Sequence, residues 1–185
     1  MPAARHQDPG PNLKATLGRL DHLTNWESRP RGSMRVRLEP MLDLLKRLGN
    51  PHHAFRSVHV SGTKGKGSVC ALVDAGLRRA GWRVGRYTSP HVEHVTERIC
   101  LLGKPVREDV LAAALAKVLN VYEEAKALTS PARDATWFDI LTAAAFVVFK
   151  DADVEIAVVE VGLGGPARLD QCGEVNRCGR YQCGT

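Results

Sequence analysis

The chain has 185 residues, of which 44% are hydrophobic and 25% charged, a composition typical of one globular domain with a single buried core. Its apolar stretches are too short to span a bilayer, and residues 1–11 lack the basic-then-apolar order of a secretion signal, so we expect a cytoplasmic protein without a membrane partner. The net charge of +6 comes from scattered basic residues with few aromatics between them, which argues against a nucleic-acid partner and suits a small polyanion.

The predicted elements alternate between helices and strands along the chain. Residues 1–34 are interpreted as an N-terminal extension with a helix, frayed over its first eleven residues. Apolar residues then recur at helical spacing from Arg35 to Leu48, and Gly49 and Pro51 end that helix. Further strands are predicted at 57–60, 82–88 and 154–161, a strand with a turn around Gly103-Lys104-Pro105 at 98–106, and further helices at 69–80, 108–128 and 136–150.

This alternation is typical of βαβ units, so the sequence predicts an α/β fold in which helices cover both faces of a parallel sheet. The predicted domain comprises residues 35–165. Residues 166–185 are rich in Gly, Cys and Arg without a period, and we expect this tail to lack regular structure. An odd number of cysteines with no paired spacing indicates free thiols, and the gaps between Cys172, Cys178 and Cys183 match no zinc motif.

A glycine-rich loop lies between a predicted strand and a predicted helix, which is the context of a phosphate-binding loop. It reads Ser61-Gly62-Thr63-Lys64-Gly65-Lys66-Gly67-Ser68. Glycines let backbone N–H groups approach phosphates, and the helix N-terminus adds its positive end. We expect residues 62–68 to bind ATP, with Lys66 as the catalytic positive charge on the phosphates. The general pattern has glycine in place of Val60 and Ser or Thr in place of Gly67, and the alternative is a glycine-rich turn with incidental lysines.

The loop sequence resembles the phosphate loop of the Mur ligase superfamily, in its folylpolyglutamate synthase and dihydrofolate synthase branch. That branch most often has Asn in place of Lys64, a position that offers mainly its backbone. Three later segments resemble the same branch in the same order, and together with the loop they extend the resemblance over residues 35–165. They are Thr88-Ser89-Pro90-His91 with Glu97-Arg98-Ile99, Thr136-Trp137-Phe138-Asp139, and Glu160-Val161-Gly162-Leu163-Gly164-Gly165.

The resemblance implies a metal site and a folate site, and the residues themselves support the first more strongly. Ser89 follows a predicted strand and Glu160 ends an apolar one, where an unpaired carboxylate is costly to bury, so Mg²⁺ is a natural partner. The alternatives are a plain Ser-Pro turn and a salt bridge from Glu160 to Lys66 or Arg98. His91 is expected to shape the loop.

The likeness implies that Thr136, Trp137, Phe138 and Asp139 lie against a pterin, since flat aromatics suit stacking on its ring. The alternative is that these residues only form the start of a helix, with Thr136 as N-cap and the two aromatic side chains in the core.

After Gly165 the family continues Arg-Leu-Asp-Ala-Thr-Asn, whereas here Pro166 and Ala167 precede Arg-Leu-Asp and the likeness then ends. Family members are more than twice as long, with a later metal-binding histidine, a carbamylated lysine and a second domain. The resemblance therefore implies the N-terminal part of a monomeric, ATP- and Mg²⁺-dependent ligase that joins L-glutamate to a folate or to dihydropteroate, inactive by itself. The alternatives are a non-catalytic Mg-ATP-binding fragment and another P-loop NTPase or kinase. The residues do not distinguish dihydrofolate synthase from folylpolyglutamate synthase.

Overall fold

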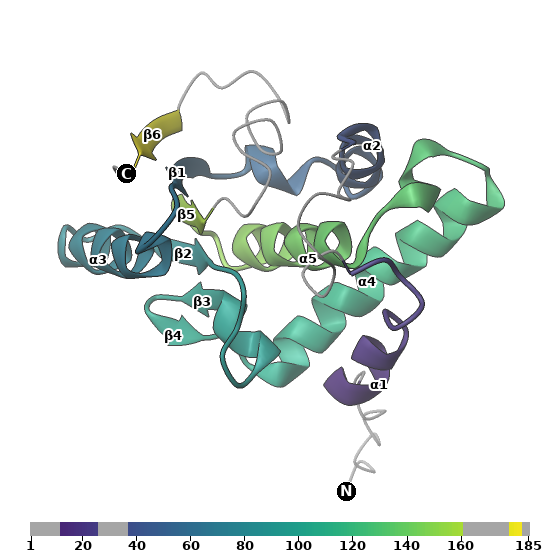
Figure 1. Cartoon of the computed structure of the whole chain (residues 1–185), viewed down its shortest axis with the longest axis horizontal. Coiled ribbons are helices and arrows are strands. Elements are labelled where there is room, and N and C mark those ends of the chain that lie inside the picture. Colours follow the sequence, from purple (N-terminus) through teal and green to yellow (C-terminus); the bar gives the residue numbers. More distant parts are fainter. Residues whose placement is uncertain (1–11, 26–36, 161–177, 183–185) are drawn as a thin grey trace, which may run out of the picture.

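A computed structural model describes residues 12–25, 37–160 and 178–182 (Figure 1). The frayed start predicted for residues 1–11, the Gly162–Gly165 signature and most of the predicted tail lie outside the described residues. The helices are α1 Leu13–Gly18, α2 Glu39–Arg47, α3 Lys66–Arg79, α4 Glu108–Ala127 and α5 Trp137–Asp151, with short 3-10 helices η2 Pro51–His53, η3 Val95–Arg98 and η4 Pro131–Asp134. The strands are β1 Arg56–Ser61, β2 Val84–Tyr87, β3 Ile99–Leu101, β4 Lys104–Pro105, β5 Ile156–Glu160 and β6 Cys178–Gln182.

The strands form one mixed sheet in the order β4-β3-β2-β5-β1-β6. The predicted α/β fold is confirmed, and β1, β2 and β5 run parallel as expected. The prediction of a wholly parallel sheet is wrong, because β3 pairs antiparallel with both β2 and β4. The segment after β2 returns along the sheet edge as β3 without a crossover helix, and a two-residue turn then joins β3 to β4, in which Leu102 and Gly103 both have positive φ, at 51° and 80°. Such turns join antiparallel strands directly, without a crossover helix.

The prediction of an irregular tail is also wrong for residues 178–182, which form β6 and pair in parallel with β1, Ser57 opposite Cys178. The physical reason is the free edge of β1. Its backbone N–H and C=O groups on that side need partners, and any extended segment that reaches them can supply these partners without a hydrophobic period.

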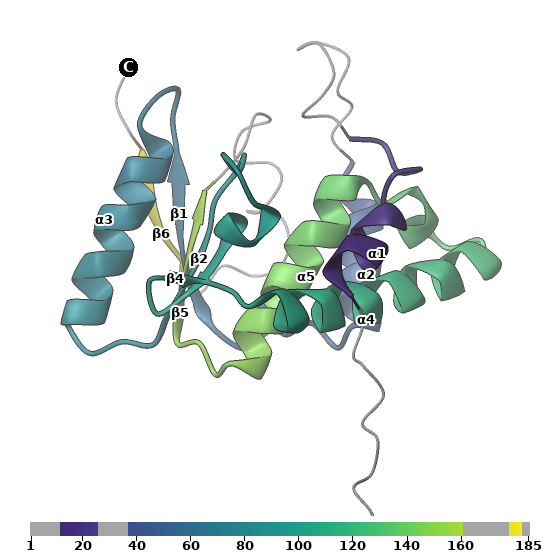
Figure 2. The same ribbon diagram turned by 90° about the horizontal axis from the view of Figure 1, so that it is seen from below.

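Helices cover the sheet unequally, as Figure 2 shows: α3 lies on one face, and α5 with α4, α2 and α1 lies on the other. The larger core is on the α5 side, where Gly85 of β2 leaves room for Phe149. A Cβ atom at Gly85 would lie 2.6 Å from the Phe149 ring, so only glycine permits this close approach. The smaller core under α3 consists of Val60, Cys70, Val84 and Val158 with neighbouring side chains. Asp74 of α3 also forms an ion pair with Arg86 of β2 at 3.8 Å.

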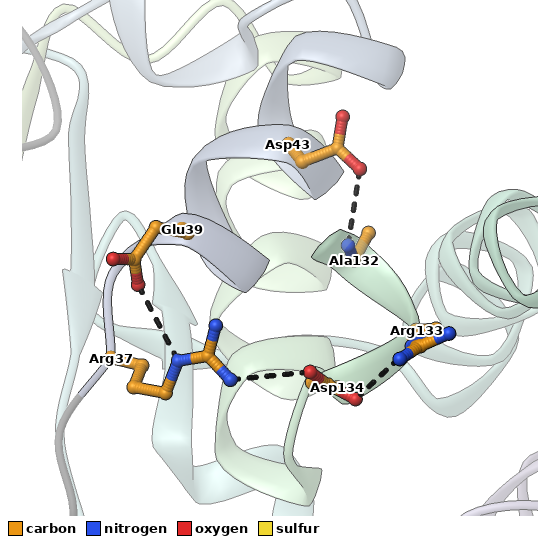
Figure 3. A network of polar contacts seen from close by, with 6 residues as sticks. All are labelled: Arg37, Glu39, Asp43, Ala132, Arg133 and Asp134. Carbon is orange, nitrogen blue, oxygen red and sulfur yellow. Dashed lines mark hydrogen bonds and ion pairs between the residues drawn. The ribbon is translucent and has the colours of Figure 1, made fainter. Parts of the chain in front are cut away.

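Polar contacts connect α2 to η4 within the helical layer (Figure 3). Asp43 accepts hydrogen bonds from Ser130 Oγ at 2.8 Å, from the Ala132 N–H at 3.1 Å and from Arg47 Nε at 3.2 Å. Burial raises the pKa of Asp43, but these hydrogen bonds outweigh it, so the pKa lies below its ordinary value of 3.8. This carboxylate therefore joins two segments far apart in the chain.

Among the described residues, no helix has the length and apolar character needed to cross a membrane.

Candidate functional site

Three parallel strands bring the predicted site residues to one edge of the sheet. β1 leads into the glycine-rich loop, β2 into Ser89, and β5 ends at Glu160. Val60 lies opposite Glu160, and Tyr87 lies opposite Val159, so the three strands end at nearly the same level. In Figure 2 the β1–α3 loop and the segment after β2 both stand at the upper end of the sheet. Ligands of α/β proteins bind at this edge.

The loop has the backbone form that a phosphate site requires. Gly62 and Gly65 adopt φ values of 148° and 75°, which side chains rarely tolerate. Helix α3 begins at Lys66, three residues earlier than the predicted Val69, and no side chain caps its N-terminus at Gly65. The first N–H groups of α3 therefore have no capping side chain and face the loop with the positive end of the helix dipole. Thr63, Lys64 and Ser68 are exposed around it.

Lys66, Ser89 and Glu160 meet at the centre of this edge. Lys66 Nζ lies 3.7 Å from Glu160 Oε1, and the Ser89 N–H donates to Glu160 Oε2 at 3.2 Å. The Glu160 side chain is 7% exposed and that of Lys66 is 18% exposed. The ion pair considered from the sequence as an alternative to a metal is thus formed, with Lys66 and not with Arg98. It is long for a direct hydrogen bond.

The chemistry of these groups fits a magnesium ion. Mg²⁺ is held in proteins by one or two carboxylates, with water and phosphate oxygens completing its shell. Glu160 offers a buried carboxylate and Ser89 a hydroxyl, and the described residues contain no cluster of three or more His, Cys, Asp or Glu that would form a closed metal cage. A Cβ atom at Gly67 would lie 3.8 Å from Glu160 Oε2. A long side chain at position 67 would therefore extend into the space around the carboxylate.

The segment after Ser89 is held by Glu97 and Arg98 of η3. The Glu97 carboxylate accepts from the N–H groups of Val92 and His94, each at 3.0 Å. The hydrogen bond from Val92, followed by that from His94, lowers the pKa of Glu97 below its ordinary value of 4.5. Arg98 Nε donates to His91 Nδ1 at 2.8 Å, and the loop-shaping role expected of His91 stays a prediction.

The four residues predicted to contact a pterin form the start of α5. The Thr136 hydroxyl accepts from the Asp139 N–H, and Asp139 accepts in turn from the Thr136 N–H, which is a capping box. The Arg98 guanidinium lies 5.0 Å from the centre of the Trp137 ring, and Phe138 lies 6.1 Å from Tyr87, ring centre to ring centre. The predicted N-cap at Thr136 is confirmed, and each of the four has a structural contact. A role in folate binding stays a prediction.

Sequence reasoning missed the part played by Glu97 and Arg98 in holding this segment: Glu97 entered only as part of a motif, and Arg98 only as part of that motif and as an alternative partner of Glu160. One signal was present: Glu97 stands three residues after His94, the spacing at which a glutamate accepts from the backbone at the start of a helical turn. No local pattern reveals the contact of Arg98 with Trp137, because 39 positions of chain separate the two residues.

No family model matches the chain. Curated relatives do: it is 36% identical over 148 residues to dihydrofolate synthetase of Saccharomyces cerevisiae, covering 80% of this chain and 33% of that protein. It is 35% identical over 175 residues to dihydrofolate synthase/folylpolyglutamate synthase of Mycobacterium tuberculosis, covering 91% and 35%.

Solved structures agree. Folylpolyglutamate synthase of Thermotoga maritima superposes with a TM-score of 0.72 at 34% identity, over 83% of this chain and 34% of that one. A bifunctional folylpolyglutamate synthase/dihydrofolate synthase with Mn, AMPPNP and L-glutamate bound gives a TM-score of 0.68 at 31% identity, over 86% and 36%. The chain spans about a third of the length of these relatives. It is a homologue of the folylpolyglutamate and dihydrofolate synthases, a family of ATP-dependent ligases, and corresponds to one third of their length.

Proposed function

We propose that this chain binds Mg-ATP at the edge formed by the glycine-rich loop, Ser89 and Glu160, as the nucleotide-binding part of a ligase that joins L-glutamate to a folate or to dihydropteroate. The observation that carries the proposal is the meeting of Lys66, Ser89 and Glu160 beside the N-terminus of α3. A cation, a hydroxyl and a buried carboxylate next to free helix N–H groups are what a metal-bound triphosphate requires.

Each group has a distinct part in this proposal. The N–H groups of the loop and of the first turn of α3 bind phosphate oxygens, and Lys66 neutralises charge on them. Because the Lys66 Nζ to Glu160 Oε1 distance is 3.7 Å, little hydrogen-bond energy opposes the lysine moving from the carboxylate to a phosphate. Glu160 and the Ser89 hydroxyl would hold Mg²⁺, which supplies charge neutralisation during phosphoryl transfer.

The reaction proposed for the complete ligase is amide formation through an acyl phosphate. The γ-phosphoryl group of ATP moves to a substrate carboxylate, and ADP leaves. The amine of L-glutamate then attacks the acyl carbon and phosphate departs. What supports glutamate as the second substrate is the homologous structure that contains it together with AMPPNP and Mn. For this reaction the protein contributes mainly positioning and charge stabilisation.

Folate is proposed to bind near the start of α5, where Trp137 and Phe138 are half-buried and Thr136 and Asp139 lie beside them. Aromatic faces suit a pterin ring. The support here is the sequence resemblance together with the position of Phe138. Its ring centre lies 6.1 Å from that of Tyr87, the β2 residue two positions before Ser89, so the start of α5 lies near the proposed metal site.

For a polypeptide of these 185 residues alone, we propose nucleotide binding without ligation, because the homologues use about three times this length. The test is calorimetric titration with ATP, in Mg²⁺ and in EDTA, followed by an assay of ADP release with and without L-glutamate and tetrahydrofolate or dihydropteroate. We expect binding that Mg²⁺ strengthens, a loss of that strengthening in Glu160→Gln, and no glutamate-dependent ADP release. Absence of any ATP binding would refute the proposed site. Glutamate-dependent turnover would show instead that these residues suffice for catalysis.

A further inference from the structure

Glu97 and Arg98 are adjacent residues of η3 that hold the segment after Ser89 from two sides. The Glu97 carboxylate binds backbone N–H groups of Val92 and His94, and the Arg98 side chain binds the His91 ring. Two residues thus fix three successive parts of a loop that carries no regular structure between Ser89 and His94. Charge-assisted hydrogen bonds of this kind are roughly twice as strong as neutral ones.

Arg98 also contacts residues outside the segment between Ser89 and His94. Its carbonyl oxygen accepts from the Thr88 N–H at 2.9 Å, directly before Ser89, and its guanidinium lies over the Trp137 ring at 5.0 Å. The whole residue is only 2% exposed. A single buried side chain and its backbone therefore contact both sides of Ser89 in sequence and also the first residue of α5.

We propose that Arg98 is a positioning residue that keeps Ser89 against Glu160 and couples this metal side of the site to the aromatic start of α5. The inference rests on the proposed function, in which Ser89 and Glu160 hold Mg²⁺. A guanidinium suits the position because it offers an N–H at its edge and a flat face to an aromatic ring at the same time. A lysine ammonium keeps the charge but has no flat face and no fixed donor direction. The substitution Arg98→Lys therefore keeps the positive charge and removes the planar geometry of the guanidinium.

The experiment compares wild type, Arg98→Lys and the matched control Arg107→Lys, whose side chain is 79% exposed at the start of α4. ATP affinity is measured in Mg²⁺ and in EDTA, and hydrogen exchange of the Ser89 amide is measured without ligand. We expect Arg98→Lys to weaken binding in Mg²⁺ by about tenfold or more, as losses beside metal ligands do. Binding in EDTA, which depends on the glycine-rich loop, should stay within about twofold, a shift of only about 0.4 kcal/mol.

The Ser89 amide donates to Glu160, and its hydrogen exchange should be faster in Arg98→Lys than in wild type and unchanged in Arg107→Lys. The comparison is made between proteins with equal melting temperatures. Should Arg98→Lys not fold, His91→Phe removes the acceptor of Arg98 Nε from a half-buried loop position and should give the same pattern. Equal affinities and equal Ser89 exchange in wild type and variant would overturn the positioning role alone. Failure of the wild type to bind ATP more tightly in Mg²⁺ would overturn the proposed function, and this inference with it.

Discussion

Two carboxylates show how differently this molecule uses the same chemical group. Asp43, on α2, accepts three hydrogen bonds at 2.8 to 3.2 Å, with its side chain 21% exposed. Figure 3 shows the one that the Ala132 N–H of η4 donates. Glu160, at the end of β5, is more buried at 7% exposed, yet within the described part of the chain its contacts are one N–H at 3.2 Å and one ammonium at 3.7 Å.

The difference teaches what each group can still bind. Asp43 accepts its three hydrogen bonds at one atom, Oδ2, and two of the donors belong to the η4 segment, so its contribution is to the fold. Glu160 is buried with one hydrogen bond at 3.2 Å and one ion pair at 3.7 Å, which repay the cost of burying its charge only in part, so an incoming cation improves its state. Buried charge with incomplete satisfaction distinguishes Glu160 from Asp43.

The largest effect should come from removing the cation beside Glu160. Lys66→Ala is expected to weaken Mg-ATP binding by about tenfold to hundredfold, since hydrogen bonds to charged groups contribute about 1.5–3 kcal/mol. The control is Lys117→Ala, which removes the same charge from an exposed position on α4. Titration calorimetry measures both. Equal affinities in the two variants would mean that Lys66 does not contact the phosphates.

The next effect concerns stability and belongs to Asp43. Asp43→Ala leaves the donors from Ser130, Ala132 and Arg47 without their acceptor and is expected to lower the free energy of unfolding by about 1–3 kcal/mol. Glu39→Ala removes a carboxylate that is 65% exposed and paired with Arg37 at 3.7 Å, and should change it by less than about 1 kcal/mol. Urea denaturation measures the free energy of unfolding of both variants, and both should bind ATP as tightly as the wild type does. Weakened ATP binding in Asp43→Ala would contradict a purely structural role.

A smaller effect is the pH dependence of that contribution. Because the pKa of Asp43 in the folded state lies below 3.8, its stabilisation is fully present above pH 3.8 and is lost as pH falls through the folded-state pKa. The difference in unfolding free energy between wild type and Asp43→Ala should therefore be constant from pH 7 to pH 5 and shrink below pH 3.8. Denaturation curves at stepped pH measure it. A difference that grows on acidification would have the wrong sign for a depressed pKa.

The smallest effect tests whether Thr136 has a structural role, as Asp43 does, or a role in the candidate site, as proposed for Glu160. Thr136→Ala removes the N-cap of α5 and should cost about 1 kcal/mol of stability, with Mg-ATP affinity unchanged. Thr136→Ser keeps the hydroxyl and should restore most of this loss. If both variants keep full stability but bind folate more weakly in the complete ligase, Thr136 acts on the substrate and not on the helix.

Much of the fold follows from local signals that the sequence contains. The spacing of apolar residues predicted α4 to within one residue, and the hydroxyl at Thr136 predicted the start of α5. The meeting of the glycine-rich loop, Ser89 and Glu160 followed from strand order, because parallel strands end at one edge. These features depend on residues close in sequence or on the general geometry of βαβ units.

What the sequence did not predict depends on long-range pairing. The antiparallel pairing of β3 with β2 joins segments that no local pattern relates, and β6 pairs with β1 through backbone groups that every residue has. The contacts of Arg98 with His91 and Trp137 need the folded chain, since nothing in the side chain alone selects its partners. Patterns of hydrophobicity carry no information on such contacts.

Helix α3 has one end in the proposed phosphate site and its body on the sheet, and it is the described helix that covers that face. A nucleotide bound at its first turn therefore contacts the same helix that shields Val60, Val84 and Val158 from water. By mass action, ligand that binds only the docked helix stabilises the docked helix. ATP in the cell would then act as a folding partner for this face of the sheet, and a change in the packing beneath α3, such as at Cys70, would be felt as a change in nucleotide affinity.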